Sequence, residues 1–168
     1  MSVPQGSKGQ RRIATILQQI PAAREQLFVA MEGFGPNLAE PEFLAAAQSP
    51  DARERNRVAV IERQYEVLLN WMHELAARGL AEGQRLGVVD KTPGHAWERL
   101  AALSVISHTS AERLQEAKEM RDALGHAYPP ANWKTLREGV LALVQELDRY
   151  TDRFARWVYA EGILPSEN

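Results

Sequence analysis

The chain has 168 residues, of which 25% are charged and 45% hydrophobic, with a formal net charge of −2 and no cysteine. This length predicts one domain that is large enough to bury its own core. The near-neutral charge excludes a protein that coats nucleic acid in general, although an enzyme with one local basic cleft remains compatible with it. The lack of cysteine excludes disulfides, thiol nucleophiles and cysteine-based metal sites.

The N-terminal segment is polar and has no apolar core of the kind found in signal peptides. No stretch of the chain approaches the ~20 apolar residues that a membrane span needs. We therefore expect a disordered polar leader over residues 1–8 and a single domain over 9–168. We also expect a cytoplasmic location and no membrane partner.

Apolar residues recur every three or four positions almost throughout the chain, which predicts helices and no strand. The first helix is predicted over 9–31, and Pro21 is expected to kink or restart it. A loop over 33–37 follows. A short helix is then predicted after Pro41.

A long helix is predicted to start at residues 49–51. Ser49 suits the N-cap and Pro50 the first helical position, and the negative charge of Asp51 suits the first turn, where the helix dipole is positive. We expect it to run to Arg78 or Gly79. It carries an apolar stripe that is either a core face or an oligomer seam. The stripe consists of Val58, Ile61, Tyr65, Leu68, Met72 and Leu75.

Beyond a predicted loop over 83–91, Thr92 and Pro93 are expected to open the next helix. A further helix is predicted to begin at a capping box formed by Thr109 and Glu112.

The last helix is predicted from a cap at Asn132 to about Glu161, with Gly162 after it. Its apolar face is Leu136, Val140, Leu143, Leu147, Tyr150, Phe154, Trp157 and Val158. The fold class expected from these elements is an all-α helical bundle, built around two long antiparallel helices with shorter flanking helices.

One short stretch combines three reactive side chains: Arg121, His126 and Tyr128. Arginine is always charged, and its planar fork of donors fits a phosphate. Histidine exchanges protons near neutral pH. Tyrosine adds a hydroxyl that can act as a nucleophile or a hydrogen-bonding group. The stretch is therefore a candidate site for phosphate chemistry.

The local backbone is predicted to bring these groups together. Gly125 favours the conformation that ends helices, and Pro129 disfavours a helical conformation for the residue before it. We predict that the helix ends near Leu124, with His126 and Tyr128 pointing the same way on extended chain. From the residues alone, a plain helix C-terminus with basic groups beside the negative end of the dipole is the more common explanation of this pattern.

The three residues resemble the Arg-x-x-x-x-His-x-Tyr signature of HepT toxins, a branch of the HEPN superfamily of small helical ribonucleases. The likeness in helical organisation runs from about Ser49 to Leu164, whereas likeness in residue detail is confined to the motif. The family often has asparagine directly after the arginine, and this chain has Asp122 there. Asp122 either pairs with Arg121 and holds it, or weakens its binding of phosphate.

The resemblance implies an HEPN-like bundle that acts as a metal-independent endoribonuclease, the toxin of a type VII-like toxin–antitoxin pair. It implies a homodimer in which two motifs face each other, with His126 as base and acid and Arg121 on the phosphate. No metal or cofactor is expected. The implied partners are RNA and an MNT-type nucleotidyltransferase antitoxin, which would neutralise the toxin by transferring AMP to Tyr128.

Two other functions stay open. Some HEPN-like proteins are non-catalytic partners that bind nucleotides or present a substrate to a nucleotidyltransferase, and Asp122 and the near-neutral charge favour that alternative. The third interpretation is a helical interaction module in which the motif is accidental.

Three basic residues flank the motif and are candidates for binding RNA: Lys118, Lys134 and Arg137. They alternate with acidic residues, so they form either a solvated face with local ion pairs or a rim that binds phosphates.

The remaining histidines and tryptophans give weaker signals. His73, His95 and His108 lack the spacing of a metal site and are interpreted as structural or solvated side chains. Trp71, Trp97, Trp133 and Trp157 fit core or interface positions, and Trp133 is also a candidate for stacking on a base.

Overall fold

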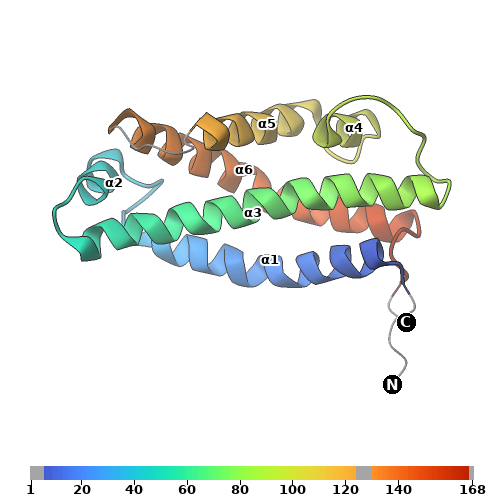
Figure 1. Cartoon of the computed structure of the whole chain (residues 1–168), viewed down its shortest axis with the longest axis horizontal. Helices are drawn as coiled ribbons and strands as arrows, with labels where there is room; N and C mark the ends of the chain where they lie inside the picture. The colour runs from blue at the N-terminus through green and yellow to red at the C-terminus, as the bar shows by residue number, and fades with distance from the viewer. Residues whose placement is uncertain (1–5, 124–129, 167–168) are drawn as a thin grey trace, which may run out of the picture.

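The structure is a computed structural model that describes residues 6–123 and 130–166. These residues form six α-helices and no strand, which confirms the predicted all-α bundle (Figure 1). No helix within these ranges is long and apolar enough to cross a membrane. The helices are α1 (Lys8–Glu32), α2 (Glu40–Ala47), α3 (Ala52–Arg85), α4 (Ala96–Ala102), α5 (His108–Ala123) and α6 (Pro130–Ala160).

The bundle is built from two antiparallel helix pairs, α1 with α3 and α5 with α6 (Figure 1). Arg12 of α1 meets Glu74 at one end of α3, and Arg57 of α3 meets the carbonyl of Gly33 at the other. The predicted antiparallel packing of long helices is present within these pairs. The two longest helices, α3 and α6, run in the same direction (Figure 1).

The predicted apolar stripes form the core. All six stripe residues of α3 are buried, and so are those of α6 except Trp157, which is partly buried against the core. The short helices α2 and α4 both pack against α3 and add the fully buried Phe43 and Trp97 to the core. Burial of these faces, rather than the intrinsic preference of each helix, is what stabilises the fold.

Helix α3 starts later and ends later than predicted. Its cap is Asp51, whose side chain accepts from the amide of Arg53 at 2.9 Å, rather than Ser49. It runs through Gly79 because this glycine lies against α6, where a Cβ atom would come within 2.9 Å of the ring atoms of Phe154 and Trp157. This glycine serves close helix packing instead of ending the helix.

The starts of α4 and α5 also differ from the predictions. Thr92 and Pro93 open no helix, because Gly94 has a φ of 122° and α4 begins only at Ala96. The first turn of α5 is capped by Ser107, whose hydroxyl accepts from the amide of Ser110 at 3.0 Å. The predicted capping box two residues later therefore lies inside the helix.

The ends of the described chain lie together. Ser7 caps α1, and Gln10 completes the capping box, so the helix begins one residue before the predicted domain boundary; residues 1–5 lie outside the described ranges. The side chain of Gln10 also donates to the carbonyl of Ile163, just after α6, at 2.9 Å. At the other end of α6, the helix already includes Pro130, so Asn132 is not its cap.

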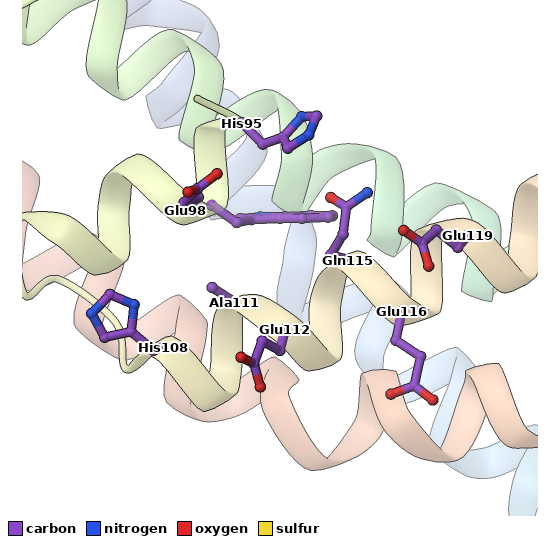
Figure 2. A pocket seen from close by; sticks show the side chains of 9 residues that line it. His95, Glu98, His108, Ala111, Glu112, Gln115, Glu116 and Glu119 are labelled. Atoms are coloured by element: carbon purple, nitrogen blue, oxygen red, sulfur yellow. The ribbon is translucent and has the colours of Figure 1, made fainter. Parts of the chain in front are cut away.

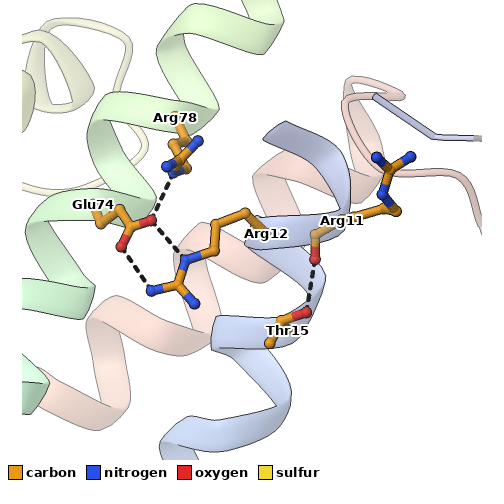
Figure 3. A network of polar contacts seen from close by, with 5 residues as sticks. All are labelled: Arg11, Arg12, Thr15, Glu74 and Arg78. Atoms are coloured by element: carbon orange, nitrogen blue, oxygen red, sulfur yellow. Dashed lines mark hydrogen bonds and ion pairs between the residues drawn. The ribbon is translucent and has the colours of Figure 1, made fainter. Parts of the chain in front are cut away.

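A polar cluster fixes α1 to α3 (Figure 3). Arg12 of α1 binds Glu74 through two nitrogens at 2.8 and 2.9 Å, and Arg78 of α3 adds a third contact at 2.6 Å. The hydrogen bond from Arg12 lowers the pKa of Glu74 to about 2, against the opposing effect of burial and with further help from Arg78.

Glu74→Gln tests this cluster by removing the charge while keeping the shape. The folded-state pKa lies below the ordinary value of 4.5, so the charge stabilises the fold above that pH and its contribution disappears as the pH falls toward about 2. Because both arginines are partly exposed, we expect a loss of ~1 kcal/mol at pH 7. Urea unfolding at pH 7, 4 and 2 measures it.

The matched control is Glu25→Gln, an exposed position of α1 that takes part in no ion pair among the described residues. It should leave the free energy of unfolding nearly unchanged at all three pH values. A Glu74→Gln loss that persists undiminished at pH 2 would contradict the assignment to charge.

Candidate functional site

Arg121, the first residue of the motif, lies in the last described turn of α5. Its guanidinium donates through Nη1 to the side-chain oxygen of Asn70 on α3, and through Nη2 to Asp122 at 3.0 Å. The Arg121 side chain is 24% exposed, whereas that of Asp122 is 58% exposed. Of the two effects considered for Asp122, the structure therefore contains the pairing that holds the arginine.

The other two motif residues, His126 and Tyr128, lie outside the described residues, and so does the predicted helix end near Leu124. Of the predicted site, the structure places Arg121 and Asp122.

Tyr65 fixes the turn of α5 that precedes Arg121. Its buried hydroxyl donates across from α3 to the carbonyl of Ala117 at 2.5 Å. From the third helix, α6, Gly139 packs so closely that a Cβ atom there would lie 2.6 Å from the same hydroxyl. Burial raises the pKa of Tyr65 above its ordinary range, so the phenol stays protonated and remains a donor.

His73 of α3 lies one helical turn after Asn70, on the same side of the helix. Its imidazole makes an edge-on contact with the buried ring of Trp97, with centroids 5.2 Å apart and planes at 85°. The histidine is half-buried, so this contact restricts the orientation of its ring.

Positively charged residues of α5 affect the pKa of His73. Burial lowers its pKa most, and the positive charges of Lys118 and Arg121 lower it further, followed by His95. From the sequence alone, His73 was interpreted as a structural or solvated side chain. The sequence holds no local signal for this arrangement, because only the packing of α3 against α5 brings these residues together.

The other two candidate RNA-binding residues make structural contacts away from Arg121. Lys134 pairs with Glu40 of α2 at 3.7 Å. Arg137 donates to the carbonyls of Leu38 and Asn37 at 2.6 and 3.2 Å, in the loop before α2. Of the three predicted rim residues, Lys118 is thus the one that lies near Arg121: the charges of both act on His73. Trp133 is partly buried and packs against the core.

A pocket of about 390 Å³ opens between α4 and α5 (Figure 2). Arg121 is not among the residues that line it. Its rim is acidic, so it disfavours an anionic ligand. Two histidines also line it, yet no three histidine, aspartate or glutamate residues within the described ranges are grouped to hold a metal ion. The charged or titratable residues that line the pocket are His95, Glu98, His108, Glu112, Glu116 and Glu119.

A double-mutant cycle between Tyr65→Phe and Gly139→Ala tests how the site is positioned. Removing the hydroxyl should cost about 1 kcal/mol. The added methyl should cost about 1–3 kcal/mol, partly offset by the better helix propensity of alanine. Because Tyr65→Phe removes the atom that the methyl would clash with, we expect the double variant to lose less than the sum by more than about 0.5 kcal/mol. Urea unfolding gives all four values.

Tyr150→Phe combined with Gly139→Ala is the control pair. Tyr150 is a second buried tyrosine that donates to a backbone carbonyl, that of Met72 at 2.6 Å. It lies about 16 Å along α6 from the glycine. This pair should be additive, and equal coupling in both pairs would exclude a specific contact at Tyr65.

Comparison of the chain with protein-family models, with curated proteins and with solved structures gave no match in any of the three. A function for this chain is therefore inferred from its own residues and from the motif.

Proposed function

We propose that this protein is a metal-independent endoribonuclease of the HEPN type, and the toxin of a type VII-like toxin–antitoxin pair. The observation that carries the proposal is the state of Arg121. It is the first residue of the Arg-x4-His-x-Tyr motif, and it is held at the end of a helix by partners on two sides, Asn70 and Asp122, in an all-helical bundle.

The proposed reaction uses the 2′-hydroxyl of the RNA as nucleophile. A base removes the proton of that hydroxyl while its oxygen attacks the adjacent phosphorus, and an acid protonates the 5′-oxygen that leaves. One histidine cannot do both in a single concerted step, so two copies of His126 from a homodimer serve as base and acid. Arg121 stabilises the charge that develops on the phosphate.

The contacts of Arg121 suit this role. A guanidinium that is already oriented loses less side-chain entropy when it binds a phosphate, and it needs less reorganisation in the transition state. The bond from Asn70 leaves the charge of the arginine uncompensated, because an amide is neutral. The more exposed Asp122 carboxylate is the partner that a phosphate would replace.

We further propose that an MNT-type nucleotidyltransferase controls the enzyme by transferring AMP to Tyr128. The motif places this tyrosine two residues after the histidine. A bulky phosphodiester there would add a negative charge beside the phosphate-binding groups and repel RNA.

The second candidate function is a non-catalytic HEPN partner of such a nucleotidyltransferase. One observation favours it: Asp122 already occupies one nitrogen of Arg121.

Cleavage of labelled RNA in EDTA by the purified protein distinguishes the two functions. Intact mass must first show that Tyr128 carries no AMP. We expect cleavage by the wild type and a loss of at least about 10²-fold in His126→Ala, because a general acid–base group is removed. The control is His108→Ala, an exposed histidine outside the motif. Absence of cleavage by unmodified, dimeric protein would support the binding partner instead.

Tyr128→Phe tests the proposed control. The variant keeps the ring but has no hydroxyl to accept AMP, so it should remain toxic in cells that also express the nucleotidyltransferase. Growth of these cells is the measurement, with wild-type toxin as the neutralised control. If the partner still neutralises the variant, modification of Tyr128 is not the main control.

A further inference from the structure

We propose that Asn70 and His73 of α3, with Lys118 and Arg121 of α5, form a subsite for a backbone phosphate of single-stranded RNA. These four residues are called the α3–α5 subsite below. That its ligand is RNA rests on the proposed ribonuclease function, whereas its preference for a phosphate rests on the groups themselves.

The two helices present these groups toward each other. Asn70 and His73 are three residues apart on α3, and so are Lys118 and Arg121 on α5, so each pair lies on one side of its helix. The hydrogen bond from Arg121 to Asn70 joins the two sides directly. The bond between Tyr65 and the carbonyl of Ala117, next to Lys118, fixes how the helices meet.

The groups of the subsite are donors suited to an anion. Lysine, arginine and an imidazole N–H each donate to phosphate oxygens, and arginine retains further N–H groups beyond the two that are engaged. The contact with the ring of Trp97 restricts the orientation of the His73 imidazole. Among the ion pairs of the described residues, none includes Lys118 or His73.

The balance of charge at the subsite depends on pH. Burial lowers the pKa of His73 most, and the basic groups Lys118 and Arg121 of α5 and His95 before α4 lower it further, which favours the neutral imidazole. Two carboxylates, Glu66 and Asp122, act on the neighbouring Tyr65. A bound phosphate would favour the protonated imidazole, so binding should tighten as the pH falls.

The acidic pocket between α4 and α5 sets one border of the subsite. Carboxylates from Glu112, Glu116 and Glu119 lie along that part of α5 (Figure 2). They repel a polyanion, so the strand is confined to the side of α5 that faces α3.

The test measures binding of a fluorescent, fully 2′-O-methylated RNA octamer to the full-length protein by anisotropy. This probe keeps every phosphate but has no free 2′-hydroxyl, so binding is observed without cleavage. Lys118→Gln should weaken binding about 5-fold at low salt and reduce the slope of log K against log salt by about 0.7. The control is Lys8→Gln, an exposed lysine at the start of α1, which should change affinity less than about 2-fold.

The contribution of His73 is read from the pH dependence. In the wild type, affinity for the octamer should rise between pH 8 and pH 6, and His73→Gln should remove a large part of that rise. Thermal unfolding by circular dichroism verifies that each variant is folded. Equal losses in Lys118→Gln and Lys8→Gln, or an unchanged pH dependence in His73→Gln, would overturn the subsite.

Two further experiments, a competition and a cleavage assay, test the identity of the ligand and the ribonuclease reaction separately. If free AMP competes as well as an unlabelled octamer, the site takes a mononucleotide and the assignment to a strand fails. If the protein binds the octamer through Lys118 and His73 but cleaves no unmodified RNA, the subsite stands and the ribonuclease proposal fails. If Lys118→Gln and His73→Gln both cleave RNA as fast as the wild type, the subsite is overturned while the ribonuclease proposal stands.

Discussion

The arrangement of the candidate site depends on one buried contact, at which Tyr65 of α3 meets α5 and α6. Its hydroxyl bonds the carbonyl of Ala117 and lies directly against Gly139. A larger residue than glycine would push α6 away, and loss of the hydroxyl would remove the polar bond that links α3 to α5. Arg121 follows Ala117 by one helical turn, so its reach to Asn70 depends on this contact.

The sequence predicts the helical architecture well because apolar periodicity reports which faces are buried. The stripes of α3 and α6 come out buried as predicted. Helix ends were predicted less well, and Gly79 illustrates why. A glycine after a helix and a glycine that lets two helices touch have the same local sequence signal. The rings of Phe154 and Trp157, supplied by a helix about 75 residues later, decide which of the two it is.

The site was predictable in part for a related reason. Arg121 stood out because its motif is local, with all three groups inside eight residues. Asn70 and His73 carry no signal of their own, since polar residues on the outer side of a long helix are usually solvated. Their role becomes visible only when α5 brings the guanidinium of Arg121 to Asn70 and its charge near His73, which requires knowledge of the helix packing. In the same way, Arg137 was a candidate phosphate-binding residue from the sequence, because its partners, two backbone carbonyls in the loop before α2, are far away in the chain.

The net charge of −2 conceals a separation of charge across α5. Carboxylates line the pocket toward α4, while Lys118 and Arg121 face α3. A duplex that presents phosphates over a broad surface would bring some of them against Glu112, Glu116 and Glu119. A single strand can place a phosphate on Lys118 and Arg121 and turn its other side to solvent. The distribution of charge on one helix therefore favours single-stranded RNA as the ligand of the proposed subsite, even though the protein as a whole is slightly acidic.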